Sequence, residues 1–280
     1  MPDQNQSFQE LLKDLTDEGD ELASTVEWLS EKQLSTPTPA QGWDIRRTIG
    51  HLKWTDETAV MAVSDPDGFT GWLDEKLAEA TPELMDTFVD DAAALASKGD
   101  PDFLLSRWSS ARMNLNKAMA SRAPSDRVPW FGPSMSVMSM ATARMMETWA
   151  HGQDIRDALE IAPRSTPRLR HIAFLGVRTR DYAYSVHGLE PPTEPFRVEL
   201  VLTGPDMSSV DDGKTLVFGP EDAREKVTGT VLDFCLLVTK RRHLADLSLE
   251  VVGAQAEQWL SIAQAFAGPP GPGRAPGVKG

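Results

Sequence analysis

Cysteine is almost absent from this chain of 280 residues, which carries only Cys235. A single cysteine cannot form a disulfide within the chain, and this fits a reducing compartment such as the cytoplasm. Cys235 lies in the apolar stretch LDFCLLV. This setting favours an inert buried thiol over a reactive nucleophile, because apolar surroundings disfavour the thiolate.

Long apolar runs are also missing. No stretch approaches the roughly 18–20 apolar residues of a membrane span. The first residues, MPDQNQSFQELLKD, lack the basic patch and apolar segment of a secretory signal. We therefore expect a cytoplasmic protein without a membrane partner.

Positive charge is scarce: 28 Lys and Arg stand against 42 Asp and Glu, for a formal charge of −14. Nucleic acids and anionic membrane surfaces both require a basic surface, so neither is expected as the main partner. The hydrophobic content of 40% and the charged content of 25% are ordinary for a globular protein. The length suffices for one large domain or two small ones.

The first two thirds of the sequence predict helices, because apolar residues recur there at three- and four-residue spacing. The loop STPTPAQGWD ends at Asp44, a candidate cap for the next helix, and Ser134 is a candidate cap for a later one. The expected helical ranges are 8–29, 45–63, 82–98, 102–121, 134–160 and 167–187.

The proline-rich segment GLEPPTEP marks a change, after which alternating and β-branched patterns predict strands among helices. The tail GPPGPGRAPGVKG has the composition of a disordered segment. We expect an α+β protein, with a helical bundle over residues 1–188, a smaller α+β domain over 189–268 and a disordered tail over 269–280.

The segment METWAHGQDIRDAL places Glu147 and His151 one helical turn apart on the same face. Arg144 and Asp154 extend this polar stripe, and Asp154 is placed to accept the second ring N–H of His151. An exposed Glu–His pair would contribute only a few tenths of a kcal/mol. Little of this helix is expected to be exposed to solvent, because its other residues near the pair are the apolar Met145, Met146, Trp149 and Ala150. A buried carboxylate beside an imidazole calls for a pairing partner or a cation.

A second histidine, His51 in TIGHLKW, has Thr48, Trp54, Thr55 and Thr58 at helical spacing. A lone histidine of this kind is more often a core residue than a ligand. Three ligands from two helices are nevertheless what an open catalytic metal site in a bundle requires. Spacing alone does not show that the three side chains meet.

The segments GWDIRRTIGHL and ARMMETWAHGQDIRDAL together resemble the DinB-like superfamily, more narrowly the mycothiol-dependent maleylpyruvate isomerase branch. In that family a GW…HL motif and a later E…H pair supply three metal ligands. The resemblance therefore implies His51, Glu147 and His151 as ligands of one divalent metal, with zinc expected. The segment from GPEDAREK to the tail resembles the small sterol-carrier-like C-terminal domain of the same branch.

The resemblance implies an enzyme that uses mycothiol, a low-molecular-weight thiol, to attack an electrophilic small molecule in actinobacterial specialised metabolism. A thiol S-transferase or an isomerase would be such an enzyme, because a metal favours the thiolate of a bound thiol. The same ligand set also suits a metal-dependent hydrolase or lyase that activates water. A non-catalytic small-molecule binder remains a third reading. A monomer or a homodimer is expected.

Basic residues are the candidates for substrate contacts. Arg144 lies on the ligand face, where it could pair with a substrate carboxylate or with Glu147 itself. The run TKRRH supplies Lys240, Arg241, Arg242 and His243. The resemblance implies that an arginine of the C-terminal domain, Arg241 or Arg242, faces the metal. A polar thiol calls for basic side chains in its binding site, and Lys240 and His243 are candidates for that contact. The alternative for this run is a solvated helix end favoured by the helix dipole.

Aromatic residues near the expected site are the last candidates. Trp54 shares a helix with His51, and Trp130 enters the helix that carries the Glu–His pair. We expect both to line the thiol site. For these two, as for Trp43 and Phe131, packing in the core or as a helix staple is the competing interpretation.

Overall fold

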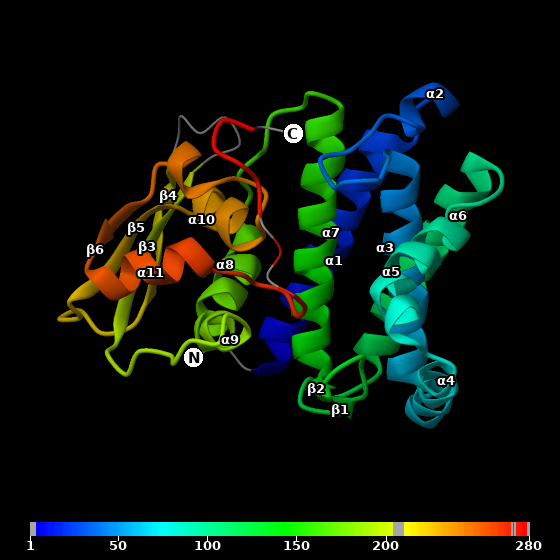
Figure 1. Ribbon diagram of the computed structural model, residues 1–280, viewed down its shortest axis with the longest axis horizontal. Helices are drawn as coiled ribbons and strands as arrows, with labels where there is room; N and C mark the ends of the chain where they lie inside the picture. Colours follow the sequence, from blue (N-terminus) through cyan, green and yellow to red (C-terminus); the bar gives the residue numbers. More distant parts are fainter. Residues whose placement is uncertain (1–3, 204–209, 270, 272, 279–280) are drawn as a thin grey trace. The chain divides into compact units, whose positions relative to one another are not determined.

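The computed structural model describes residues 4–203, 210–269, 271 and 273–278, and it is an α+β protein (Figure 1). The chain forms two compact units, Met1–Glu160 and Ile161–Gly280. The first is helical and the second contains the larger sheet. The predicted fold class is therefore confirmed. Within the described residues, no helix combines the length and apolarity needed to cross a membrane.

The first unit is built from long helices joined by short loops. Its helices are α1 (Gln4–Val26), α2 (Glu31–Leu34), α3 (Ile45–Ser64), α4 (Pro66–Ala78), α5 (Pro82–Ala96), α6 (Pro101–Ala120) and α7 (Val137–Ala158). A two-stranded ribbon, β1 (Arg127–Val128) and β2 (Met135–Ser136), precedes α7. The helices α1, α3, α6 and α7 pack on one another and enclose the core of this unit.

The core of the first unit follows from the helical spacing of apolar residues. Phe8, Leu11 and Leu12 of α1 are buried in one cluster with Met140 and Met145 of α7. A second cluster joins α1, α2, α3 and α6 and ends at Ile155 of α7. The two clusters hold α3 against α7, the two helices that carry the predicted metal ligands.

Two capping interactions set where the ligand helices begin. The Asp44 carboxylate accepts a hydrogen bond of 2.7 Å from the Arg47 N–H and caps α3, as predicted. The prediction of Ser134 as the cap of α7 is wrong, because Ser136 caps this helix by accepting from the Ser139 N–H at 3.1 Å. Pairing of β2 with β1 keeps residues 135–136 extended, and this delays the helix start.

Helix α5 approaches α3 closely at Gly50, next to His51. A Cβ at position 50 would lie 2.7 Å from the Ala93 carbonyl oxygen. Such a contact is shorter than packed atoms tolerate, so glycine is required for this approach. The α5 helix thereby covers α3 beside the predicted ligand.

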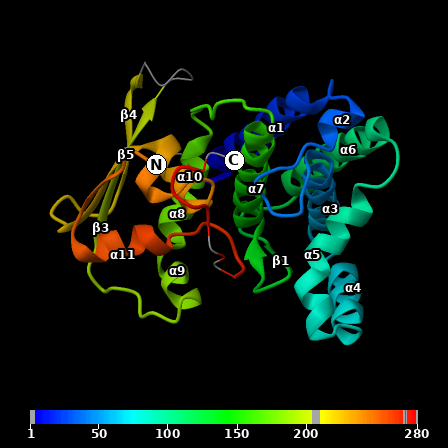
Figure 2. The same cartoon turned by 45° about the horizontal axis from the view of Figure 1, so that its top comes forward.

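The second unit begins with α8 (Leu169–Arg178) and α9 (Arg180–Val186). Its sheet contains β3 (Phe196–Thr203), β4 (Val210–Phe218), β5 (Glu225–Thr230) and β6 (Glu250–Val252), and its other helices are α10 (Val231–Val238), η1 (Leu244–Asp246) and α11 (Ala254–Ile262). The strand order is β4-β3-β5-β6, in which β3 and β5 are parallel and the outer pairs are antiparallel. Helices α10 and α11 pack against the sheet (Figure 2).

The alternating burial of β3 places its apolar side chains under these helices. Trp259 of α11 makes edge-to-face contacts with Phe196 and Phe234, at centroid distances of 5.6 and 5.9 Å. Helix α8 packs on α10, where a Cβ at Gly176 would lie 2.9 Å from Val238. This packing explains why α8 and α9 belong to the second unit, whereas the sequence placed the boundary at residue 188.

The tail lies partly outside the described residues, since 270, 272, 279 and 280 are not among them. Within the described part, the Gly277 N–H donates to both carboxylate oxygens of Asp246 at 2.9 Å. The disorder expected for 269–280 stays a prediction.

Candidate metal centre

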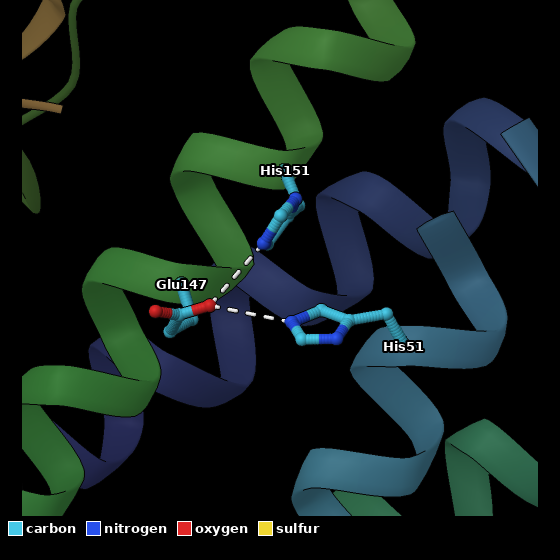
Figure 3. Close-up of side chains that lie close together, drawn as sticks. All are labelled: His51, Glu147 and His151. Carbon is cyan, nitrogen blue, oxygen red and sulfur yellow. Dashed lines mark ion pairs between the residues drawn. The ribbon is translucent and has the colours of Figure 1, made fainter. Parts of the chain in front are cut away.

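Three side chains from two helices converge on one point in the first unit. Figure 3 shows His51 of α3 and His151 of α7 both directed at the same carboxylate oxygen of Glu147. Their Nε2 atoms lie 3.5 and 3.2 Å from Glu147 Oε2. Among the described residues, they form the one group of three or more His, Cys, Asp or Glu residues whose ligand atoms all lie within 4.8 Å of one another.

The spacing of these atoms fits a metal ion. Two ligands at about 2.0–2.1 Å from a tetrahedral ion lie about 3.3 Å apart. The observed distances of 3.5 and 3.2 Å bracket this value, while 3.5 Å exceeds the usual N–H···O hydrogen-bond range. Two imidazoles and one carboxylate form a donor set that suits zinc and related divalent metals and leaves coordination positions open. His51, Glu147 and His151 are therefore suited to hold a divalent metal ion.

The helix surface around the pair is buried rather than wet. Met145, Met146, Trp149 and Ala150 are each at most 3% exposed. The Glu147 side chain keeps 27% of its surface exposed, against 8% for His51. The helix α7 is thus buried on the faces beside the pair, and Glu147 keeps the largest exposed fraction of the three ligands, which is not the setting of a surface ion pair.

The protonation states of His51 and Glu147 favour metal binding near neutral pH. Burial lowers the pKa of His51 to about 4, although the adjacent Glu147 carboxylate acts in the opposite direction. Burial alone would raise the pKa of Glu147, but its contacts with His151 and His51 outweigh burial and hold the pKa well below its ordinary value. A neutral imidazole and an ionised carboxylate are the forms that ligate a metal.

Two neighbours orient the ring of His151. Its Nδ1 lies 3.4 Å from Asp154 Oδ2, and the role of Asp154 as an acceptor for this ring N–H stays a prediction. The Trp43 indole stacks on the ring at a centroid distance of 5.9 Å and an interplanar angle of 11°. A carboxylate beside Nδ1 favours the tautomer that leaves Nε2 available to a ligand, and the stacked indole restrains the plane of the ring.

The ring of His51 is held mainly by aromatic contacts. The Trp43 ring lies edge-on to it at a centroid distance of 5.1 Å. The Trp54 ring, on the same helix as His51, has its centroid 6.1 Å from that of the imidazole. The hydroxyl of Thr55 donates to the His51 backbone carbonyl rather than to the ring. No hydrogen-bond partner of His51 Nδ1 is found among the described residues.

Arg144 binds a carboxylate inside the bundle. Its Nε and Nη2 both lie 2.9 Å from Asp56 Oδ1, and both side chains are 3% exposed. Asp56 belongs to α3, so this pair joins the same two helices as the ligands. The predicted role of Arg144 on a substrate stays a prediction.

Trp54 and Trp130 both belong to a cluster of aromatic rings whose centre is Phe131. Trp54 contacts Phe131 at 5.8 Å and is the member next to His51. Trp130 stacks on Phe69 at 5.9 Å and meets Phe131 at 4.9 Å. Trp54 thus borders the metal centre, whereas Trp130 lies one ring further along the cluster.

The basic run at 240–243 lies in the second unit, in the turn that follows α10. Lys240 adopts a left-handed backbone with φ 62°, and burial lowers its pKa. Arg241 donates to the Thr239 carbonyl at 2.7 Å. Arg242 donates to the carbonyl of Arg241 at 2.6 Å, and His243 Nδ1 accepts from the Ala245 N–H. The roles predicted for these four residues towards the metal and the thiol stay predictions.

Two residues near the centre have contacts that the sequence did not indicate. Trp43 was interpreted as a core or staple residue, yet it contacts both imidazoles and donates from Nε1 to Asp90 at 2.6 Å. The second residue is Asp56, to which no role was assigned from the sequence. The sequence pattern that indicates a buried, paired carboxylate here is a charged residue on a helix face otherwise occupied by Leu52, Thr55 and Ala59.

Proteins of similar sequence and solved structures of similar fold are known. Two uncharacterized proteins of Mycobacterium tuberculosis, from strains H37Rv and CDC 1551, are each 49% identical to this chain, covering 93% of it and 96% of the relative. Crystal structures of the mycothiol-dependent maleylpyruvate isomerase and of a histidine-to-alanine mutant of it share the fold. Their TM-scores are 0.55 and 0.54 at 14% identity, and each match covers 82% of this chain and 88% of the other.

Residues 15–156 match the family described as the mycothiol maleylpyruvate isomerase N-terminal domain. This range contains α3, α7 and all three residues of the candidate metal centre. Because the matched range makes up half of the chain, we conclude that the chain belongs to the mycothiol maleylpyruvate isomerase N-terminal domain family.

Proposed function

We propose that the protein is a metal-dependent enzyme that uses mycothiol to act on an electrophilic small molecule, as an isomerase or a thiol S-transferase. The observation that carries this proposal is the convergence of His51, Glu147 and His151 from two helices, at ligand spacing. The description of the family and the names of the solved neighbours, both of which mention mycothiol, support the choice of thiol.

The residues that would hold the metal, zinc in our proposal, are His51, Glu147 and His151. A bound divalent cation supplies a Lewis acid that lowers the pKa of a coordinated thiol from about 8.5 and so favours the thiolate at neutral pH. Glu147 contributes the negative charge of the ligand set, and its exposed edge leaves the site open to solvent. Neutral His51 offers a nitrogen lone pair without the cost of losing a proton at pH 7.

The remaining residues of the centre orient ligands and exclude water. Asp154 and the stacked Trp43 hold the ring of His151, which keeps Nε2 turned towards Glu147. Trp54 offers an apolar surface beside His51. An electrophile with an apolar part would lie against this ring and shield the reacting thiolate from solvent.

Metal analysis of the purified protein tests the centre. We expect stoichiometric metal in the wild type and loss of most of it in Glu147→Ala and His151→Ala. A matched control is His187→Ala, because His187 is an exposed histidine of the second unit. Stoichiometric metal in both site variants would refute the proposed centre.

Thiol dependence is tested on the same metal-loaded samples with mycothiol and maleylpyruvate, the substrate named for the solved neighbours. We expect consumption of the electrophile only when the thiol is present. Turnover without any thiol that a chelator abolishes would instead identify a hydrolase or lyase that uses activated water. Metal that resists chelation, with no reactivity on any electrophile, would identify a binding protein.

A further inference from the structure

The ion pair of Asp56 and Arg144 lies about one helical turn from the metal centre and joins the same two helices. Asp56 follows His51 by five residues on α3, and Arg144 precedes Glu147 by three on α7. At about 1.5 Å per residue, the pair is displaced by about 7.5 Å along α3 and about 4.5 Å along α7. We infer that Asp56 and Arg144 are positioning residues that fix the register of α3 against α7 and thereby hold His51 opposite Glu147.

The carboxylate of Asp56 connects three helices. One oxygen accepts from Arg144 Nε on α7 at 2.9 Å, and the other accepts from Trp108 Nε1 on α6 at 3.2 Å. Trp108 is itself 1% exposed. Both oxygens of a buried group are thus in use, so the group has little freedom to rotate or shift.

A buried pair of this kind is a costly way to hold a bundle together. Burial raises the pKa of Asp56 even though the guanidinium of Arg144 acts in the opposite direction. Apolar residues of similar size often stabilise a core as well as a buried ion pair does, or better. Unlike apolar contacts, the hydrogen bonds of the pair depend on direction. The Asp56 oxygens can accept from Arg144 and Trp108 only when α3, α6 and α7 are in one register.

The metal centre needs such a constraint. The apolar clusters hold α3 against α7, but apolar contacts have no fixed direction and tolerate small rotations and shifts. The ligand distances of a metal site must be correct to about 0.2 Å. A fixed contact on the same two helices removes this freedom. The pair lies at the right place for this purpose, and its atoms do not belong to the ligand set.

The experiment compares Asp56→Asn, Arg144→Gln and the double variant with the wild type and with Leu12→Ala. Leu12 is a buried core residue of α1, so its truncation provides a loss of stability without a change at the pair. In Asp56→Asn the amide cannot accept from both Arg144 and Trp108, and the guanidinium charge is left without its counter-charge. Cobalt(II) is the probe, since its absorption spectrum reports ligand geometry.

We expect each single variant to bind cobalt about tenfold more weakly than the wild type, the low end of the range for residues that orient metal ligands. The double variant should lose no more than either single variant, because the connection is already broken. Leu12→Ala should keep wild-type affinity and spectrum even if it is destabilised equally. If Leu12→Ala lost as much cobalt affinity as Asp56→Asn or Arg144→Gln at the same loss of stability, the inference would be overturned.

A second readout does not require metal. In the metal-free wild type, the imidazole nitrogen signals of His51 and His151 in an NMR spectrum should report their contact with Glu147, and Asp56→Asn should change the signal of His51. The inference rests on the proposed metal centre only through the cobalt titration. If the wild type binds no cobalt, the proposed function fails, and unchanged histidine signals in Asp56→Asn would separately refute the positioning role.

Discussion

Metal ions are expected to raise the thermal stability of the first unit, and Glu147→Ala is expected to abolish most of this gain. The ligands His51 and Glu147 are separated by about a hundred residues of sequence. The unfolded chain therefore does not present them together, and the metal binds the folded state almost exclusively. Binding to the folded state alone stabilises it by mass action.

The size of the effect follows from the linkage relation and the size of the unit. Free zinc at 100 times its dissociation constant would stabilise the fold by about 2.7 kcal/mol. For a unit the size of Met1–Glu160, each kcal/mol raises the melting temperature by about 2–4 °C. The wild type should therefore melt about 5–10 °C higher with the metal than after chelation.

The assay is differential scanning calorimetry of the chelated protein with and without added zinc. The exposed His187 again provides a control, since His187→Ala should show the full wild-type shift. Glu147→Ala removes the only carboxylate of the ligand set, so its shift at the same zinc concentration should fall below about 2 °C. A shift in Glu147→Ala equal to that of the wild type would refute the reasoning, because the metal would then be bound elsewhere.

Three further predictions concern individual residues. Burial raises the pKa of Cys235 well above its ordinary value, so this thiol should resist alkylation by iodoacetamide in the native protein. Cys235→Ser should keep thiol-dependent turnover. Rapid alkylation of Cys235 in the native protein would contradict this prediction. Asp154→Asn should weaken zinc affinity about tenfold in a competition titration, since it weakens the hold on the ring of His151, and an unchanged affinity would count against that role. Trp54→Ala should raise the KM for substrate several-fold, because an aromatic contact contributes about 0.5–1.5 kcal/mol, whereas Trp130→Ala should leave the KM nearly unchanged; equal effects would show that neither ring faces the substrate.

The helices and the local part of the site could be predicted because both depend on short-range spacing. Glu147 and His151 are neighbours on one turn of α7, so their proximity follows from the helix period alone. The Asp44 cap and the burial of residues around the pair follow from equally local patterns. The meeting of His51 with this pair depends on packing between distant segments, and only the family resemblance indicated it.

Features that depend on long-range partners were missed. Trp43 contacts both imidazoles because its indole N–H is fixed by Asp90 of α5, a partner distant in sequence. Helix α4 is not among the helical ranges expected from the sequence, since its start SDPDG is rich in turn residues. Those residues, however, also form a helix start, with Asp65 as the cap and Pro66 in the first turn. Local patterns of this kind fit both structures, and packing decides between them.

The central claim is that a metal held by His51, Glu147 and His151 binds the sulfur of a thiol. The most direct test is the absorption spectrum of the cobalt(II) protein during titration with mycothiol. The account predicts a new sulfur-to-cobalt charge-transfer band that saturates with the thiol and is absent in His151→Ala. A cobalt spectrum that does not change at saturating mycothiol would contradict the claim.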